Sequence, residues 1–389
     1  MKRREWMQLA SLFTAAGSLP LLQVCSERQA RQPDAPLRIG YLPITDATPL
    51  LVAHSQRLFE AEGVMTERPV PFQDWAQLLE AFISGQVNLV HMMAPMAVWA
   101  RYGSQASLKV LMWNHIAGSA LTVRPDIDSV AALGGHTVAI PYWYSIHNVV
   151  LQHLLRRQGL AATEQDLPDP GQVRLVVMAP ADMVAGLAAG RIAGCIVAEP
   201  FNALAESQGL GRVLRFTGDV WRDHACCVTV MHGGDVAHRP EWVQKVTTAL
   251  VKAQRWTLEN RCETAALLAA SGTGQYTPHT RATLAQVLAP TRQAWADYVA
   301  RGAIRHPEWQ QARIDFQPYP FPSYTEKLVQ LLRHTRVAGD NAFLQSLDPA
   351  RVAMELVDER FVRQAIEATG SRAAFHLAAD YTRVETLAA

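Results

Sequence analysis

The sequence predicts an α/β protein with largely parallel strands, divided into two lobes of similar plan. Strand-like runs alternate with helical ones up to about residue 240, an order typical of parallel sheets. Two segments, "LLEAFISGQVNLVHMM" and "MVAGLAAGRIAGCIVAEP", share one plan, in which a short amphipathic helix ends at Gly and a strand follows. With 389 residues, the chain is long enough to bury a large core and to form two lobes.

The expected elements follow one another as pairs of a strand and a helix. In order, they are "LRIGYLP" with a helix near 49–62, "QVNLVHM" with one near 95–102, "HTVAIP" with one from Ser145, "GCIVAEP" with one from Phe201, and "CCVTVMH" with a long one from Pro240. Ser145 belongs to the residue types that cap helices, and apolar residues recur behind it at helical spacing. After about residue 240 the pattern is mainly helical, with a Pro-rich interruption at "FQPYPFPSY".

Charge and motifs favour a binding protein. The net charge of +1 gives no reason to expect a nucleic-acid partner or an anionic membrane surface. The sequence contains no serine-hydrolase, P-loop or HExxH motif. The four cysteines after residue 25 form no regular disulfide framework, and the adjacent pair Cys226 and Cys227 is of a kind that rarely bridges to itself.

The first residues have the pattern of an export signal. "MKRREW" is basic, and the apolar stretch "MQLASLFTAAGSLPLLQV" is short and interrupted by proline. The pair Arg3 and Arg4 resembles a twin-arginine signal, which implies folding before export, and an ordinary secretory signal is the alternative. Cys25 stands where a bacterial lipoprotein carries its acylated cysteine. Gln23 and Val24 replace the small residues expected before it, so cleavage without a lipid is an equal alternative.

The stretch "AIPYWYSIHNVVLQHLL" (139–155) sets three aromatic residues, a serine and a histidine on a strand-to-helix turn. Backbone N–H groups at a helix N-terminus have no partner within the helix and are suited to hold a ligand. We therefore predict that His147 contacts a ligand and that at least one of Tyr142, Trp143 and Tyr144 packs against it. Since side chains alternate, at least one aromatic of the turn faces the core. The alternative is that His147 only caps its helix.

The order of several motifs identifies a family resemblance. "RIGYLPITDATPLLVAHSQRLFEAEGV", "WNHIAGSALTV", "GGHTVAIPYWYSIHNVVLQHLLRRQGL", "MAPADMVAGLAAGRIAGCIVAEPFNALA" and "GDVWRDHACCVTVM" occur in this order, from about residue 37 to 258. They resemble the nitrate/sulfonate/bicarbonate/taurine group of ABC-transporter solute-binding proteins. The resemblance implies a periplasmic-binding-protein (type II) clamshell that closes over a small solute. It also implies an ABC permease and an ATPase as partners. We expect a periplasmic monomer that has no cofactor and catalyses no reaction.

On this resemblance we expect four segments in the chain. Residues 1–36 would form the export signal and linker, 37–122 the first part of lobe 1, 123–222 lobe 2, and 223–389 the return to lobe 1 with C-terminal helices. The lobes would open and close about two crossing strands, near 121–124 and 220–228.

The resemblance also implies roles for single residues. His147 matches the histidine that contacts the anion in nitrate and bicarbonate binders, and Thr45 and Asp46 match the first strand–helix turn. Glu199 belongs to the "EPFN" that matches the family's "EPWN". Asp46 as a helix cap and Glu199 as a turn former are the alternatives. The residues predicted to contact ligand are Thr45, Asp46, Met92, Trp113, Ser119, Tyr142, Trp143, His147 and Glu199.

One departure from the family bears on the solute. The nitrate and bicarbonate members have "HPEK", whose lysine or a neighbour helps bind the ion, where this chain has "HACC" (224–227). An uncompensated buried anion is costly, so nitrate is disfavoured. The aromatic residues suit a larger, partly flat organic solute.

Three other interpretations compete with solute delivery. "HMMAPM" beside His115, His224 and Cys227 would suit copper. Methionine runs are more often adaptable core filling, and these histidines lie on separate segments, so we predict no metal ligands. An enzyme related to thiamine-pyrimidine synthase would need a longer cysteine-rich loop than "HACCV". An exported sensor would use the same clamshell and is indistinguishable by sequence.

Overall fold

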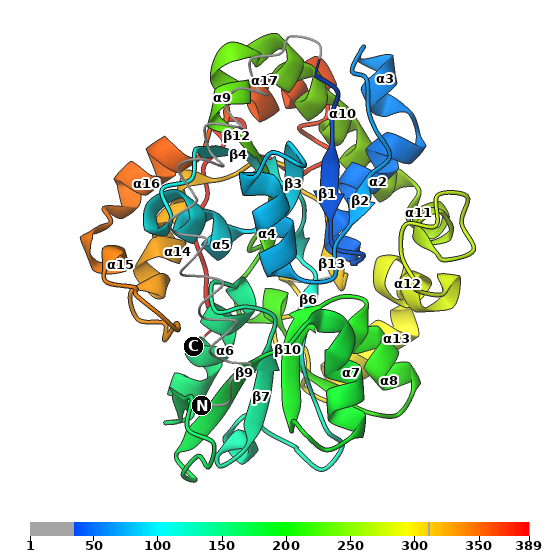
Figure 1. Ribbon diagram of the computed structural model, residues 1–389. Coiled ribbons are helices and arrows are strands. Elements are labelled where there is room, and N and C mark those ends of the chain that lie inside the picture. The colour runs from blue at the N-terminus through cyan, green and yellow to red at the C-terminus, as the bar shows by residue number, and fades with distance from the viewer. Residues whose placement is uncertain (1–34, 310–311, 389) are drawn as a thin grey trace.

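Two separate sheets form the centres of two lobes, which lie one above the other in Figure 1. The structure, a computed structural model, describes residues 35–309 and 312–388. The lobe 1 sheet has the order β2-β1-β3-β12-β4, with strands β1 (Ile39–Tyr41), β2 (Val70–Pro71), β3 (Leu89–Met93), β4 (Leu108–Trp113) and β12 (Cys227–His232). The lobe 2 sheet has the order β11-β6-β10-β7-β9-β8, with strands β6 (Ser119–Val123), β7 (Thr137–Ile140), β8 (Ala161–Thr163), β9 (Gln172–Val177), β10 (Gly194–Ala198) and β11 (Arg212–Phe216).

Each sheet contains one strand that runs against the others. In lobe 1 it is β12, which pairs antiparallel with both β3 and β4, and in lobe 2 it is β6, which pairs antiparallel with both β10 and β11. The other pairs within these two sheets are parallel. These observations confirm the predicted two-lobed α/β fold with mostly parallel sheets.

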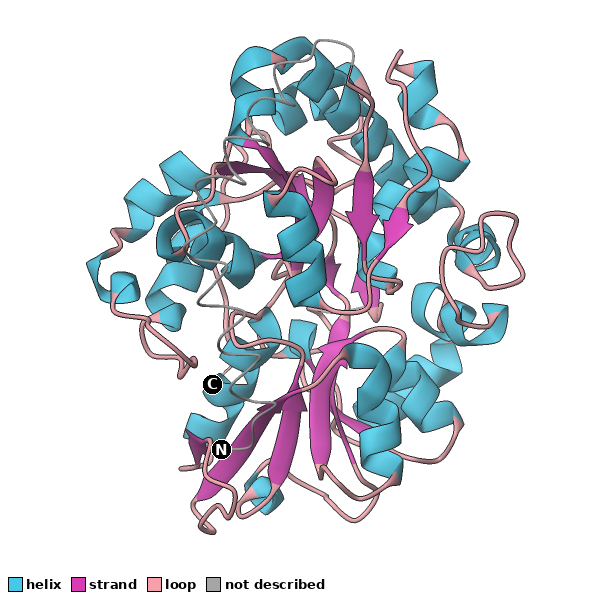
Figure 2. Ribbon diagram, viewed as in Figure 1, coloured by secondary structure: helices cyan, strands magenta, loops and turns pink. Residues whose placement is uncertain are grey.

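Helices cover the faces of both sheets (Figure 2). Lobe 1 carries α2 (Thr48–Ser55), α3 (Leu58–Ala61), α4 (Trp75–Ile83), α5 (Ala94–Val98), α9 (Gly233–His238), α10 (Pro240–Glu259), α14 (Pro322–Leu332), α15 (Phe343–Ser346), α16 (Pro349–Leu356) and α17 (Arg360–Ala368). Lobe 2 carries α6 (Ile146–Arg157), α7 (Pro180–Ala188) and α8 (Phe201–Ser207). Along one side, α11 (Arg261–Leu268), α12 (Arg281–Leu288) and α13 (Arg292–Ala300) run from lobe 1 toward lobe 2 (Figure 1).

The repeated helix–Gly–strand unit is present in both lobes. Helix α4 is followed by Gly85 with a φ of 77° and then by β3, and α7 is followed by Gly190 with a φ of 65° and then by β10. Glycine adopts this left-handed backbone without steric cost, so it ends both helices and turns the chain back to the sheet. The sequence echo therefore reflects a shared local structure.

Two of the expected helices are less regular than the sequence pattern indicates. The helix expected near 49–62 is divided because Arg57 has a φ of 54° between α2 and α3. The helix expected near 95–102 continues from α5 as a short π-helix, η2 (Trp99–Gly103).

The chain crosses between the lobes several times. It crosses before β6, which begins lobe 2 at Ser119, a few residues before the expected boundary, and it returns before β12. A third passage was not expected: Tyr298 of α13 and Ile304 pack with Phe216 of lobe 2. The chain then returns through β13 (Ile314–Asp315), which pairs with β5 (Ile116–Ala117). The domain boundaries given above remain predictions.

The predicted export signal, with Arg3, Arg4 and Cys25, lies outside the described residues. Among residues 35–309 and 312–388, none of the helices has the length and apolar character needed to cross a membrane.

Candidate binding site at the junction of the lobes

Several of the predicted ligand contacts meet where the two sheets face each other. Thr45 and Asp46 lie in η1 (Thr45–Ala47), a 3-10 turn directly after β1 of lobe 1. Ser119 begins β6 and His147 lies in the first turn of α6, both in lobe 2. All four side chains are buried. The structure therefore brings these predicted site residues together from both lobes.

Ser119 and His147 form a hydrogen-bonded pair on the lobe 2 side. The Ser119 Oγ lies 2.9 Å from His147 Nε2. The cap of α6 is Ser145, whose Oγ accepts a hydrogen bond from the Asn148 N–H at 3.1 Å, as predicted. Because Ser145 fills the capping position, capping does not explain His147.

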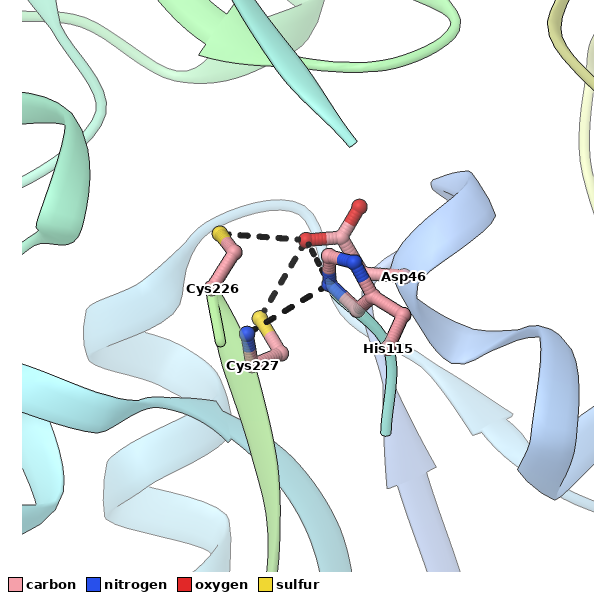
Figure 3. Close-up of side chains that lie close together, drawn as sticks. All are labelled: Asp46, His115, Cys226 and Cys227. Atoms are coloured by element: carbon pink, nitrogen blue, oxygen red, sulfur yellow. Dashed lines mark hydrogen bonds and ion pairs between the residues drawn. The ribbon is translucent and has the colours of Figure 1, made fainter. Parts of the chain in front are cut away.

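Asp46 is the centre of the lobe 1 side. Figure 3 shows one of its carboxylate oxygens directed at His115, Cys226 and Cys227. The Asp46 Oδ1 lies 3.0 Å from His115 Nε2, 3.5 Å from Cys226 Sγ and 3.3 Å from Cys227 Sγ. The Cys226 sulfur is also 3.9 Å from both the Ser119 Oγ and the His147 Nε2. The two groups of side chains are thus in contact across the junction.

Main-chain hydrogen bonds fix the "HACC" segment. The Cys226 carbonyl accepts from the Ala94 N–H at 3.0 Å, and the Cys227 carbonyl accepts from the Asn114 N–H at 3.0 Å. The Tyr324 hydroxyl donates to the Ala225 carbonyl at 2.6 Å. Within a strand, neighbouring side chains point to opposite faces of the sheet. Cys226 lies just before β12 and Cys227 is its first residue, and both sulfurs approach Asp46.

Burial and close charges shift the pKa values in this cluster. Burial lowers the pKa of His115, but the adjacent Asp46 carboxylate outweighs burial and raises it to about 10. Burial raises the pKa of the Cys226 thiol, but the Cys227 thiol and the two histidines, His147 and His115, together hold it well below its ordinary value. Burial and then the nearby Cys226 raise the pKa of Cys227. The pKa values of the two adjacent thiols are therefore shifted in opposite directions.

Glu199 and Thr45 join the lobes through a structural network. The Thr45 N–H and hydroxyl donate to the Glu199 carbonyl at 3.1 and 2.9 Å. The Glu199 carboxylate accepts from Arg313 at 2.7 Å and from the Ala203 N–H at 3.2 Å. This arrangement favours the turn-forming alternative for Glu199.

The remaining predicted contacts lie outside the polar cluster. Met92 is buried in the main core, and Trp113 lines a small apolar cavity and packs against Tyr324 at 4.9 Å between ring centroids. Tyr142 and Trp143 are half-buried. Tyr144 is buried and stacks on Trp99 with ring centroids 5.6 Å apart, which confirms that one aromatic of the turn faces the core.

Sequence reasoning did not place His115, Cys226 and Cys227 in the site. "WNH" and "HACC" lie more than 100 residues apart, and no spacing rule joins them. The one signal in the sequence was that each segment adjoins a predicted or strand-like run, and the structure pairs these two strands, β4 and β12. Ligand-type side chains at the ends of neighbouring strands converge at one edge of a sheet.

Comparison with known proteins agrees with this description. The two lobes, each with one antiparallel strand inserted in its sheet (β12 and β6), and the buried polar junction between them define a protein of the periplasmic-binding-protein fold. Residues 30–270, more than half of the chain, match the NMT1-like family, and the chain belongs to this family.

Two solved structures show the likeness of fold. The periplasmic nitrate-binding protein NrtA from Synechocystis PCC 6803 superposes with a TM-score of 0.71 at 17% identity, covering 90% of this chain and 93% of that one. A ligand-binding component of an ABC-type import system from Staphylococcus aureus, with zinc bound, gives a TM-score of 0.65 at 20% identity and covers 85% and 98%.

Curated relatives match part of their own length. The nitrate import ATP-binding protein NrtC of Synechocystis is 30% identical over 233 residues, which are 56% of this chain and 33% of that protein. The nitrate/nitrite binding protein NrtA of Nostoc is 22% identical over 263 residues, which are 62% and 58%. The chain therefore spans between about a third and three fifths of these relatives. The predicted family resemblance is confirmed.

Proposed function

We propose that the chain is the substrate-binding component of an ABC importer. It captures a small solute between its lobes and presents it to a membrane permease that works with an ATPase. Membership of the NMT1-like family, the fold, and similarity to proteins named for nitrate import and nitrate binding support this proposal. In it the protein is a periplasmic monomer whose mechanism is binding, without a catalysed reaction.

The observation that carries the proposal is the set of unpaired polar atoms at the junction. Among the residues that the structure describes, Asp46 Oδ2 and His147 Nδ1 are buried at the junction without a hydrogen-bond partner. Leaving such a group unpaired costs about 1–3 kcal/mol, so native proteins rarely do so without a reason. These atoms come from both lobes. A polar solute that pairs with them would favour the closed arrangement.

Contacts between the two lobes indicate how a solute would be held. Thr45 reaches from lobe 1 to the Glu199 carbonyl of lobe 2, and Cys226 of lobe 1 contacts His147 of lobe 2. These contacts form only when the lobes are together. A solute that touches both lobes therefore stabilises the closed form by its difference in affinity for the two forms.

We propose a small organic solute rather than a bare inorganic anion. "HACC" supplies no lysine, and burial raises the pKa of Asp46 against the opposing effect of the adjacent His115. Tyr142 and Trp143 remain half-buried beside the His147 turn and offer flat apolar surface. An uncompensated anion would have to enter next to a buried carboxylate, which is unfavourable.

Native mass spectrometry of protein from the producing cell's periplasm tests the proposal. We expect one bound organic molecule per chain, which His147→Ala loses and His153→Ala retains. His153 is the matched control because it lies on the same helix and bonds the Ala388 carbonyl instead. A thermal-shift series with nitrate, bicarbonate and the sulfonate MOPS accompanies it. We expect no shift with nitrate or bicarbonate. Protein that carries no molecule and responds to none of the three would contradict the proposal.

A further inference from the structure

The side chains gathered around Asp46 form a set of donors that suits a metal ion. A carboxylate oxygen, an imidazole nitrogen and two sulfurs lie within 4.8 Å of one another, and all four residues are buried (Figure 3). We propose that Asp46, His115, Cys226 and Cys227 bind one divalent transition-metal ion of the zinc type. Two sulfurs, one nitrogen and one oxygen are ligands that Zn²⁺ accepts, whereas Mg²⁺ and Ca²⁺ prefer oxygen alone.

The spacing of the donor atoms agrees with tetrahedral coordination. Zn–S bonds of about 2.3 Å and Zn–N or Zn–O bonds of about 2.0–2.2 Å give ligand-to-ligand edges of roughly 3.3–3.8 Å. The Asp46 Oδ1 lies 3.5 Å from the Cys226 sulfur and 3.3 Å from the Cys227 sulfur. It lies 3.0 Å from His115 Nε2, and the remaining pairs are within 4.8 Å. The three distances from the Asp46 Oδ1 are close to these edges, and the wider pairs would have to close by up to about 1 Å to complete the tetrahedron.

Hydrogen bonding alone leaves this cluster poorly satisfied. Three groups approach the Asp46 Oδ1, which has about two lone pairs, while Oδ2 of the same buried carboxylate has no partner among the described residues. His115 Nε2 is approached both by this acceptor oxygen and, at 3.4 Å, by the Cys227 N–H donor. One nitrogen cannot donate and accept at once. A cation bound by these four atoms would replace the crowded contacts on the Asp46 Oδ1 with bonds to one ion and would take the lone pair of His115 Nε2.

The neighbouring residues hold the donors in place. The Asn114 side chain donates to the Asp46 carbonyl at 3.0 Å, and the Asn114 N–H donates to the Cys227 carbonyl. A Cβ on Gly118, whose φ is +83°, would lie 2.8 Å from the His115 ring, so the ring is packed directly against this glycine. Supporting contacts of this kind orient ligands before a metal arrives.

The ion would reside in one lobe. Asp46, His115, Cys226 and Cys227 all come from lobe 1, so binding does not require the lobes to close. The Ser119–His147 pair of lobe 2 faces the Cys226 sulfur at 3.9 Å. The site is thus a resident metal centre on the lobe 1 wall of the junction, and its existence does not depend on the proposed import function.

The site shares His115 and Cys227 with the copper set considered from the sequence, but it does not include the other members of that set. His91 Nε2 accepts from the Leu42 N–H at 2.9 Å, and His224 Nδ1 contacts the Trp221 carbonyl at 2.8 Å. Met92 is buried in the apolar core. These residues have structural roles, and the donor set is instead the one joined by Asp46.

Metal titration of the full chain tests the proposal. Reduced protein, stripped with a chelator, is dialysed against Zn²⁺ or Co²⁺ and analysed by elemental mass spectrometry and absorption. We expect one ion per chain, and with Co²⁺ the thiolate charge-transfer and tetrahedral d–d bands. Cys226→Ser and Cys227→Ser should each weaken binding by about a hundredfold or more. Cys195→Ser, a buried cysteine in β10, and Cys262→Ser, an exposed one, should leave it unchanged.

Two results would overturn the metal centre. One is wild-type reduced protein that takes up neither ion, a result that needs no variant to fold. The other is uptake that survives replacement of both Cys226 and Cys227. If the protein still binds a solute, either result leaves the import proposal standing. Conversely, a protein that binds metal but carries no solute would support the metal centre and contradict the import proposal.

Discussion

Gly118→Ala offers a sharp test of the geometry at the junction. Gly118 has a φ of +83°, and an added Cβ would lie 2.8 Å from two atoms of the buried His115 ring. The left-handed backbone alone costs a non-glycine residue about 1–2 kcal/mol. If the ring must leave Asp46, a buried pair is broken, at a further cost of about 3–5 kcal/mol. We therefore expect Gly118→Ala to lower the free energy of unfolding by several kcal/mol, about 4 or more.

Two control glycines separate the two effects. Gly159 has a φ of +71°, and no atom lies within 4 Å of the position that an added Cβ would take, so Gly159→Ala should show the backbone cost alone. Gly171 has open space and no left-handed φ, so Gly171→Ala should be nearly neutral. Urea unfolding of the three variants measures the differences. Equal losses in Gly118→Ala and Gly159→Ala would refute the close packing of His115 against Gly118.

Three further predictions concern the helix cap, acid sensitivity and the lobe junction. Ser145→Ala should cost about 1 kcal/mol in urea unfolding through loss of the α6 cap, and an unchanged midpoint would contradict the capping bond. Burial, and next the Arg38 charge, lower the pKa of His232 to about 4, so its neutral form stabilises the fold above pH 6.5. That stability, on the order of 3 kcal/mol, is lost as pH falls from 6.5 to about 4, and His232→Gln should flatten a pH series of unfolding free energies there. Arg313→Met leaves the buried Glu199 carboxylate without its ion-pair partner and should cost about 3–5 kcal/mol by calorimetry, whereas a wild-type melting temperature would show that the pair contributes little.

The local features of the fold were readable from the sequence. The alternation of strand and helix patterns, the cap at Ser145 and the glycines after α4 and α7 act over a few residues. Their physical causes are side-chain periodicity, capping and backbone freedom, which neighbours in the sequence determine. The same reasoning missed the break at Arg57, because no local signal marks a left-handed arginine.

The candidate site was predictable in part. His147 was expected from the turn on which it lies and Asp46 and Ser119 from the family resemblance, and the structure brings the three together. Glu199 was expected as a ligand contact, but its carboxylate is paired with Arg313, which lies more than 100 residues further along the chain. A partner at that distance in sequence cannot be inferred from the spacing of residues.

By itself, the sequence of this protein determined its class of fold, its two similar lobes and the turn that carries His147, since all of these follow from short-range patterns. Only the tertiary structure decided that His115, Cys226 and Cys227 meet Asp46, and that α13 returns to lobe 2. The reason is the order of strands within a sheet. Strand β12 is inserted between β3 and β4, so residues far apart in the chain become neighbours at one edge, and burial there removes the water that would otherwise satisfy their polar atoms.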